Sequence, residues 1–413
     1  MRENLSCRSM SETADHLNAD LIVVNTCTVT QRTDKQVRQA LRRLHRENPA
    51  ARLVVTGCYA QRDPEGLAAI EGVRLVVGNV DRERLPEILD SQVAESEGRV
   101  ICTPLDESRD YLLPPMARTG GKTRPLVKLQ DGCDAQCTYC IVPKVRGKGR
   151  SARVEDVLAE IQSLVDKGFQ EIVLTGVHLG AYGLRLKGHA RLKDLLGQIV
   201  QIPRLGRIRL SSIEPMHFDR EIVCLVDKNP VIAHHFHIPL QSGSDRILKL
   251  MRRPYTAARF SALLKHIQGE LPDAGLGTDV LVGFPGETDQ DFAETCDLIQ
   301  DSPLSYLHVF PFSPREGTLA YSLPGRISSQ TVKRRLNAIL EISRFKNLAF
   351  RRRFLGQVLP AITLSNEEEL GTSLALTGNY IHARVPGLAE PPNRLINIRI
   401  EEVRPEATYA SLA

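Results

Sequence analysis

The stretch Asp131-Gly132-Cys133-Asp134-Ala135-Gln136-Cys137-Thr138-Tyr139-Cys140 places three cysteines within eight residues. A Cys-x3-Cys-x2-Cys spacing holds three thiolates in one tight loop, which suits a cuboidal iron–sulfur cluster with three protein ligands. The fourth iron then stays open for a substrate or cofactor. A structural zinc site is less favoured, because it needs a nearby fourth ligand and the next cysteine, Cys224, is remote. Three unrelated buried thiols are the remaining alternative.

This loop, with the aromatic residue Tyr139 just before its last cysteine, resembles the signature of the radical S-adenosylmethionine (SAM) enzymes. In that family the cysteines hold a [4Fe–4S] cluster whose open iron chelates the amino and carboxylate groups of SAM. An electron from the cluster then cleaves the sulfonium and gives a 5′-deoxyadenosyl radical. The resemblance implies that Cys133, Cys137 and Cys140 are the ligands of such a SAM cluster.

The chain has 413 residues, 42% hydrophobic and 25% charged, which is usual for a globular protein of two or three domains. No run approaches the ~18 apolar residues that span a bilayer, and the N-terminus lacks a signal-peptide core, so we expect a cytoplasmic protein with no membrane partner. Nine cysteines, partly at metal-ligand spacing, favour reduced thiols over disulfides. The net charge of +5 permits a nucleic-acid partner without demanding one.

The first hundred residues show the pattern of a small parallel α/β sheet. Apolar, β-branched runs at 19–25, 51–57 and 73–78 alternate with polar, helix-like segments. Cys27 and Cys58 follow the first two runs. Because the carboxyl ends of parallel strands form the ligand crevice, we expect both thiols to face one cleft and to form a second metal site. The alternative is that the two cysteines simply cap buried strands.

A longer α/β series follows a linker at 101–123 that is rich in proline, glycine and charge. Its strand candidates alternate with helical patterns and lie at 125–130, 171–175, 207–211, 236–240, 276–282 and 306–310. Six strands in this order predict a partial (βα) barrel rather than a complete eight-fold one. Chemistry should sit at the carboxyl ends of these strands, and the three-cysteine loop follows the first of them.

The last eighty residues change from a helical to a β pattern. The segment 333–354 carries eight lysines and arginines against one acid, Glu341, and fits a helix packed on the barrel. Its charge suits phosphate contacts, and a solvated helix face explains it equally well. The β-like runs that follow lie at 357–364, 373–377, 380–384 and 395–403 and predict a small all-β barrel.

Several strand ends carry groups that could hold SAM. Gly176, after Thr175, lets the backbone approach a ligand, and its place resembles the segment that contacts the methionine amine in radical SAM proteins. Ser212 and Glu214 offer a hydroxyl and a carboxylate for ribose or an ammonium group, with a solvated loop as the alternative. The predicted SAM contacts are Tyr139, Thr175, Gly176, Ser212, Glu214, Gln241, Asp279 and Gly283. No residue is assigned as catalytic.

His234, His235 and His237 form a small histidine group that could suggest a metal site. His235 and His237 share one strand face that leads into a barrel end. We therefore expect these side chains to line a polar cavity rather than to bind a metal.

Motifs along the whole chain closely resemble the methylthiotransferases. Besides the three-cysteine loop, they are Asn25-Thr26-Cys27-Thr28-Val29-Thr30, Gly57–Gln61, Pro239–Ser244, Met251–Tyr255 and Gly283–Thr288. The resemblance implies an α/β protein in three parts. These are a flavodoxin-like N-terminal methylthiotransferase domain at 1–100 that is incomplete, a radical SAM (βα)6 domain at 124–350, and a TRAM-like RNA-binding β barrel at 351–413.

The family pattern implies two [4Fe–4S] clusters. Cys27 and Cys58 match two of the three ligands of an auxiliary cluster that carries or delivers sulfur. The third ligand is normally a cysteine in a Gly-Cys-Lys-like motif on an earlier strand, which this sequence lacks. Cys7 stands only 20 residues before Cys27 and does not match that motif, so the role is not carried onto it. Either the chain begins late relative to its relatives, or Cys7 is an imperfect substitute.

Thr28-Val29-Thr30 and Leu174–Gly180 resemble the branch that acts on N6-threonylcarbamoyladenosine beside the tRNA anticodon. The implied activity adds a methylthio group to C2 of this adenosine at tRNA position 37. One SAM methylates a cluster-bound sulfur, and a second yields the radical that abstracts the C2 hydrogen. The alternatives are a methylthiotransferase for isopentenyladenosine tRNA or a ribosomal protein, and a non-catalytic RNA-binding iron–sulfur or zinc protein. The implied partners of this expected monomer are the tRNA anticodon loop and an electron donor such as flavodoxin or ferredoxin.

Overall fold

The computed structural model describes residues 10–90, 98–105, 111, 113, 123–186, 188, 190–367, 372–388 and 390–413. Cys7 and most of the predicted linker lie outside these ranges. The chain forms two compact units, of which the first contains Met1–Arg109, Gly132–Lys148 and Ser313–Ser322. The second contains Asp110–Asp131, Gly149–Phe312 and Leu323–Ala413. The three-cysteine loop therefore shares a compact unit with Cys27 and Cys58.

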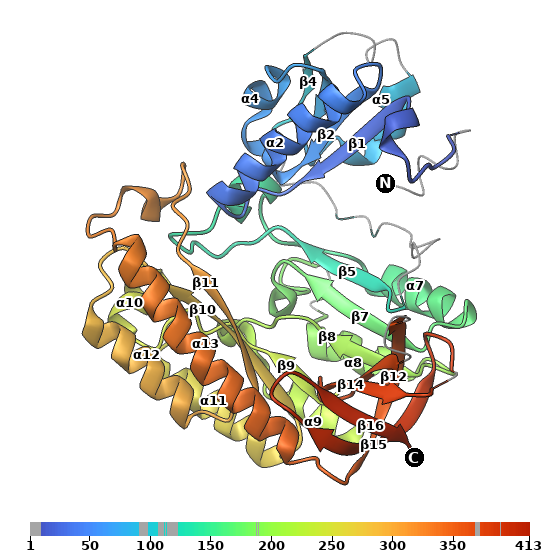
Figure 1. Cartoon of the computed structure of the whole chain (residues 1–413), viewed down its shortest axis with the longest axis vertical. Coiled ribbons are helices and arrows are strands. Elements are labelled where there is room, and N and C mark those ends of the chain that lie inside the picture. Colours follow the sequence, from blue (N-terminus) through green and yellow to red (C-terminus); the bar gives the residue numbers. More distant parts are fainter. Residues whose placement is uncertain are drawn as a thin grey trace. The chain divides into compact units, whose positions relative to one another are not determined.

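The first unit is built on the predicted parallel sheet (Figure 1). Its strands, in spatial order, are β1 (Leu21–Thr26), β2 (Arg52–Gly57), β3 (Val73–Val77) and β4 (Arg99–Ile101). The first three match the predicted runs. The sequence prediction missed β4, because three residues are too few to show an alternating pattern.

Helices cover both faces of this sheet, because alternate apolar residues of the strands point to opposite sides. On one face, Val55 and Val76 pack with Leu41, Tyr59 and Leu67 of the helices. The helices of that face are α2 (Gln31–Glu47), α3 (Cys58–Arg62) and α4 (Pro64–Ala68). On the other face, α5 (Leu85–Asp90) packs on Val54, Leu75 and Val77. Three 3-10 turns, η1 (His16–Asn18), η2 (Arg82–Arg84) and η6 (Leu319–Ser322), also belong to the described part of this unit.

The second unit contains the predicted partial barrel. Its parallel strands are β5 (Leu126–Asp131), β7 (Glu171–Gly176), β8 (Arg207–Leu210), β9 (His235–His237), β10 (Gly275–Val282) and β11 (Tyr306–Pro311). The short β6 (Arg150–Ser151) pairs antiparallel with β5. Backbone bonds from Ile208 N to Val231 O (2.7 Å) and from Ala233 N to Ile208 O (2.8 Å) join the sheet that ends at β8 to the segment before β9. The six parallel strands thus follow one another in chain order, as expected for an open barrel.

Seven helices accompany these strands in the described part of the unit. They are α7 (Val154–Asp166), α8 (Leu192–Ile199), α9 (Glu221–Lys228), α10 (Asp245–Leu250), α11 (Ala257–Glu270), α12 (Asp289–Asp301) and α13 (Ser329–Arg352). Apolar side chains of strands and helices, such as Leu129, Ile172, Ile208 and Phe260, form one continuous core. Short 3-10 turns lie at η4 (Leu179–Ala181) and η5 (Pro215–His217). None of the helices in the described ranges has the length and apolar content that crossing a bilayer requires.

The tail forms a closed five-stranded β barrel, as the β-like runs predicted. Its order is β12 (Val358–Glu367), β13 (Thr372–Thr377), β14 (His382–Pro386), β16 (Thr408–Leu412) and β15 (Leu395–Val403). The prediction had four strands and missed β16, which closes the barrel. Phe350 and Phe354, at the end of α13, enter the barrel core with ring centroids 5.1 Å apart.

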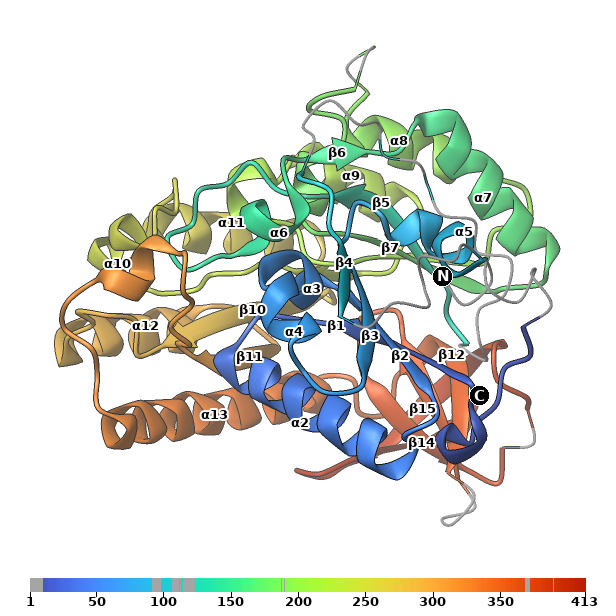
Figure 2. The same cartoon turned by 90° about the horizontal axis from the view of Figure 1, so that it is seen from above.

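The basic helix α13 runs along β11 and α12 (Figures 1 and 2), and its charges divide into two sets. Arg351 is buried and donates to the backbone oxygens of Arg404 and Pro405 at 2.9 Å, which anchors the helix to the barrel. Arg335 is also buried. Lys346 is half-buried and donates to Gln300 O at 2.9 Å, so it belongs with these two. The exposed basic residues are Lys333, Arg334, Arg344, Arg352 and Arg353. Part of the charge that suited phosphate contacts therefore has a structural role.

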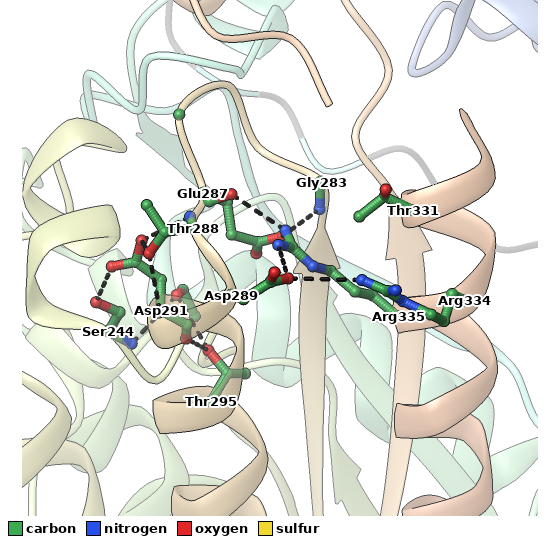
Figure 3. A network of polar contacts seen from close by, with 12 residues as sticks. Ser244, Gly283, Glu287, Thr288, Asp289, Asp291, Thr295, Thr331, Arg334 and Arg335 are labelled. Carbon is green, nitrogen blue, oxygen red and sulfur yellow. Dashed lines mark hydrogen bonds and ion pairs between the residues drawn. The ribbon is translucent and has the colours of Figure 1, made fainter. Parts of the chain in front are cut away.

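Figure 3 shows how Arg335 holds the turn between β10 and α12. Its guanidinium donates to Glu287 Oε2 at 2.6 Å and to Asp289 Oδ1 at 2.7 Å. Glu287 Oε2 also accepts a bond from the backbone N–H of Gly283 at 3.0 Å. Farther along the turn, Thr288 and Asp291 form a capping box that starts α12. The Gly283–Thr288 turn is therefore fixed by a buried ion pair at its centre.

We expect Arg335→Met to lower the free energy of unfolding by about 3–5 kcal/mol at pH 7, because it leaves the buried Glu287 carboxylate uncompensated. Burial already raises the pKa of Glu287 above its ordinary value of 4.5, against the bonds from Gly283 and Arg335. Without the guanidinium the pKa rises further, so the deficit should shrink as the pH falls from 7 toward the ordinary value. Urea denaturation at several pH values measures this.

Arg334→Met is the matched control, since Arg334 is the next residue of α13 and its side chain is 71% exposed. Its ion pair with Asp289 is a surface contact at 3.6 Å, so we expect a change of about 0.5 kcal/mol or less at every pH. Equal losses in the two variants would contradict the structural role of the Arg335–Glu287 pair.

Candidate functional site

Backbone hydrogen bonds hold the three-cysteine loop in a closed conformation. The Cys133 backbone N–H donates to Gly147 O at 3.0 Å, and Cys140 N–H donates to Cys137 O at 3.1 Å. Gly132 has a φ of +72°, and a Cβ there would lie 2.0 Å from Lys148 O, so the crossing requires glycine. Ala135 N–H donates to Cys133 Sγ at 3.4 Å. Three partly exposed cysteines on such a pinned loop fit a three-ligand cluster.

The helix after this loop, α6 (Val142–Arg146), packs beside Cys58. Ile141 and Val145 form a small apolar cluster with Cys58. Asn79 Nδ2 donates to Val145 O at 2.7 Å and lies 3.6 Å from Cys58 Sγ. The candidate cluster loop and Cys58 are therefore held in one local structure within the first unit.

Cys27 and Cys58 leave the sheet at the same edge. The register pairs Thr26 of β1 with Gly57 of β2, and each cysteine is the next residue of its strand. Gly57 has a φ of +105°, and a Cβ there would lie 2.3 Å from Thr26 O, so the strand ends meet closely. Cys27 is exposed and Cys58 is buried. Two thiols at one carboxyl edge suit a shared metal site.

A buried arginine from a distant segment holds the turn after Cys27. Arg315 is 1% exposed; its guanidinium contacts the Thr28 hydroxyl and lies 3.0 Å from Asp34 Oδ2. Asp34 also accepts a bond from Thr28 Oγ1 at 2.8 Å and pairs with Arg62 at 2.9 Å. Sequence reasoning missed Arg315, because nothing in its local pattern indicates a partner 281 residues away.

In the second unit, six of the seven predicted SAM contacts lie at or beyond the end of a parallel strand. Thr175 and Gly176 end β7, and Gly283 follows β10 directly. The loop after β8 carries Ser212 and Glu214, and Gln241 lies beyond β9, whereas Asp279 lies within β10. Tyr139 belongs to the first unit with the cysteine loop. The assignment of these residues to SAM stays a prediction.

Two of these positions have features that sequence reasoning did not foresee. Gln241 has a φ of +70°, uncommon for a residue with a side chain, and its backbone bonds to Asp279 O and Leu281 N at 2.8 Å hold it there. Glu214 is already paired with the buried Arg253. Arg253 stood in a quoted motif without an assigned role, and it now limits what Glu214 can offer to a ribose or an ammonium group.

A cavity of about 760 Å³ lies within the second unit. Its polar and aromatic lining comes from Arg124, Arg209, Ser211, Ser212, His235, His237, Asp279, Tyr306, His308, Phe310 and Tyr380, with Thr123, Leu126, Val173, Leu210 and Leu364 completing the wall. His235 and His237 line this cavity, as predicted, while His234 does not line it. That these histidines bind no metal stays a prediction. Of the predicted SAM contacts in this unit, Ser212 and Asp279 reach the cavity, and the other five do not line it.

Asp279 is the acidic group of this cavity, and two histidines hold it ionised. His237 Nε2 lies 2.9 Å and His308 Nδ1 lies 3.4 Å from Asp279 Oδ1. Burial alone would raise the pKa of Asp279, but these hydrogen bonds outweigh burial and lower it to about 2. The ligand atoms of the three residues lie within 4.8 Å of one another, which is also close enough to hold a cation.

Sequence reasoning missed Arg124, Tyr306, His308 and Tyr380 as candidate site residues. One signal was present on β11, where Tyr306, His308 and Phe310 alternate with Leu307 and Val309. A period of two places the first three on one strand face, and the same period applies to His235 and His237 on β9. No comparable signal marks Arg124 or Tyr380.

The pinned three-cysteine loop, the open barrel of six parallel strands and the preceding parallel sheet define a radical SAM enzyme. A family model for the radical SAM superfamily matches residues 127–299, and one for uncharacterized protein family UPF0004 matches residues 1–78. The chain belongs to the MiaB-like methylthiotransferases of the radical SAM superfamily. Membership implies a [4Fe–4S] cluster and SAM as cofactors.

Curated relatives cover most of the chain. "Threonylcarbamoyladenosine tRNA methylthiotransferase MtaB" of Bacillus subtilis is 36% identical over 92% of this chain and 85% of the relative. The protein of that name from Aquifex aeolicus is 37% identical over 90% of this chain and 89% of the relative. A "tRNA-2-methylthio-N(6)-dimethylallyladenosine synthase" of Sulfurihydrogenibium is 33% identical over 93% and 89%. These identities do not separate the two branches.

Among solved structures, the radical SAM methyltransferase TsrM of Kitasatospora setae superposes with a TM-score of 0.53. That match covers 70% of this chain and 61% of TsrM at 16% identity, so it supports the fold alone.

Proposed function

We propose that this chain is a tRNA methylthiotransferase that adds a methylthio group to C2 of N6-threonylcarbamoyladenosine at position 37. The choice between the two substrate branches rests on the charge of the cavity in the second unit. There the buried carboxylate of Glu171 contacts Arg124, Arg207 and Arg209, of which Arg124 and Arg209 line the cavity. With Asp279 as the second carboxylate, the three arginines leave one positive charge in excess. A threonylcarbamoyl group has a carboxylate that such a site can bind, and a dimethylallyl group has none. The names of the relatives at 36% and 37% identity support the same branch.

We assign Cys133, Cys137 and Cys140 to the SAM cluster and Cys27 and Cys58 to an auxiliary cluster. When bound by Cys133, Cys137 and Cys140, a [4Fe–4S] cluster supplies the electron for reductive cleavage of SAM. The loop itself contributes three thiolates on a backbone held by Gly132 and Gly147. Radical chemistry is needed because the bond to be broken in the substrate is an unactivated aromatic C–H bond. Acid–base groups of the protein cannot break such a bond at neutral pH.

In this proposal, the exposed basic face of α13 and the C-terminal barrel contact the tRNA. Arg334, Arg344 and Arg352 present charge to solvent on that helix, which suits contacts to phosphates. A flavodoxin or ferredoxin would supply the electron, and the protein would act as a monomer.

The test uses the protein reconstituted anaerobically with iron and sulfide, together with SAM, a reductant and tRNA that carries threonylcarbamoyladenosine. Nucleosides from the digested tRNA are then measured by mass spectrometry. We expect the methylthio derivative of threonylcarbamoyladenosine. Product formed only on tRNA with dimethylallyladenosine would place the chain in the other branch, and absence of product on both would favour the non-catalytic interpretation.

A further inference from the structure

We propose that the cavity of the second unit binds the modified adenosine, with Arg124 pairing with the carboxylate of its side chain. This inference rests on the proposed function and assigns the residues that would select the substrate. The volume of about 760 Å³ is in the range of small-molecule sites and can hold a modified nucleoside.

The cavity wall contains buried polar atoms without a partner among the described residues. They are His235 Nδ1 and Ser211 Oγ. His235 is 4% exposed, and its other ring nitrogen, Nε2, lies 2.8 Å from the Tyr306 hydroxyl. Unsatisfied buried polar groups cost free energy, so their presence in a cavity wall indicates a polar ligand. A nucleoside with a carbamoyl side chain offers both donors and acceptors to these atoms.

Aromatic rings form a flat part of the same wall. His235 and Tyr380 stack with centroids 4.2 Å apart and an interplanar angle of 17°, and Tyr306 lies 5.4 Å from Tyr380 at 27°. Tyr380, in the turn between β13 and β14, has a φ of +73°, a conformation that a bulky residue seldom adopts. Such strain is usual where a side chain is held for binding. Stacked rings of this kind offer a planar surface to a purine base.

The three arginines around Glu171 have different roles. Glu171 is fully buried and lies 2.9 Å from Arg209 Nε. Arg209 also donates to Thr377 O at 2.9 Å and Gly378 O at 3.1 Å, so it joins the barrel strands to the C-terminal barrel. Arg207 does not line the cavity. These two arginines are therefore committed to structure.

Arg124 is the cation that remains available to a ligand. It lines the cavity, its side chain is 25% exposed, and its one hydrogen-bond partner within the described residues is Glu171 Oε1 at 3.3 Å. A guanidinium has five N–H donors, so most of those of Arg124 can turn to a carboxylate. Asp279, the carboxylate on the wall, is already paired with His237 and His308. The cavity thus attracts an anion at Arg124.

The test compares two synthetic anticodon stem-loops in the reconstituted full-length enzyme. One carries threonylcarbamoyladenosine, and the other carries its carboxamide, in which the carboxylate is replaced by a neutral amide. We expect Arg124→Gln to raise KM for the carboxylate substrate about 10- to 100-fold, with kcat changed less than about threefold, because a charge-assisted bond of the ground state is lost. On the carboxamide substrate the variant and the parent should differ by less than about threefold.

Arg259→Gln is the matched control, since Arg259 is exposed on α11 and its loss changes the net charge equally. It should leave KM unchanged on both substrates, and Arg124→Lys should recover part of the loss. The parent enzyme alone gives a second measurement, which no folding defect of a variant can affect. Its KM for the carboxylate stem-loop should be lower than its KM for the carboxamide stem-loop by the same 10- to 100-fold factor. Equal KM values for the two stem-loops in the parent, or an equal loss on both in Arg124→Gln, would overturn the assignment.

The two proposals fail in different ways. A parent enzyme that methylthiolates the carboxylate substrate without preferring it over the carboxamide refutes the Arg124 assignment and leaves the proposed function standing. A parent enzyme that acts on a dimethylallyladenosine stem-loop and on neither of these two refutes both.

Discussion

Cys137→Ala should abolish SAM cleavage and lower the rate of 5′-deoxyadenosine formation at least about 1,000-fold. Changes to residues that only support a metal ligand already cost about 10- to 100-fold, and removal of a direct ligand should cost more. The loop offers three thiolates, and Cys140 N–H donates to Cys137 O, so the substitution removes one of three ligands from a backbone that is already hydrogen-bonded to itself. Chromatography of 5′-deoxyadenosine, with dithionite as the electron source, measures the rate.

Cys224→Ala provides the control for this experiment. Cys224 is an exposed cysteine on α9, so its loss changes the thiol count without touching the loop. Iron content and SAM cleavage should match the parent. A Cys137→Ala protein that keeps its full iron content and still cleaves SAM would show that the loop does not hold the cluster, and the assignment of Cys133 and Cys140 would fall with it.

Local periodicity was enough to predict the strands that carry the site. The runs before Cys27 and Cys58 are short, apolar and rich in β-branched residues, and the structure has β1 and β2 there. The three-cysteine motif could be interpreted directly, because all its ligands and the glycine that bends it are neighbours in sequence. Strand β16 was missed at the chain end, where Thr408 and Ala410 are the buried residues of the strand and give too weak an apolar signal.

The cavity could not be predicted, because its parts meet only through the fold. Arg209 donates to Thr377 O, which lies 168 residues away in the sequence. Tyr380, from the C-terminal barrel, stacks on His235 of the central domain. A sequence shows that charges are present but not which of them are buried together. The sequence likewise does not show that the carboxylate of Glu214, which could serve a ligand, is paired with Arg253.

The basic helix shows this limit for electrostatics. Counting charge over 333–354 treats all eight basic residues as one surface, yet Arg335 and Arg351 are buried and bonded inside the protein. Helical periodicity alone did not reveal this, since a long aliphatic stem lets an arginine occupy a buried position and still reach polar partners. The proposed tRNA contact therefore rests on fewer cations than the sequence suggests.

The double variant Cys27→Ala/Cys58→Ala should separate radical generation from sulfur insertion. We expect 5′-deoxyadenosine formation to stay within about threefold of the parent, because the SAM loop keeps its own ligands. Formation of the methylthio nucleoside should fall at least about 1,000-fold, because both described thiols at the carboxyl edge of β1 and β2 are gone. Iron content should fall from about eight to about four atoms per chain.

Asn79→Ala distinguishes ligand loss from local repacking, since Asn79 contacts both Cys58 Sγ and Val145 O but offers no thiolate. It should keep about eight irons, as expected of two clusters, and retain methylthio transfer within about tenfold. Product formation that survives in the double variant would exclude Cys27 and Cys58 as ligands of a sulfur-delivering cluster. A parent protein that binds only about four irons and yet makes product would contradict the two-cluster assignment, because the SAM loop would then account for all the metal.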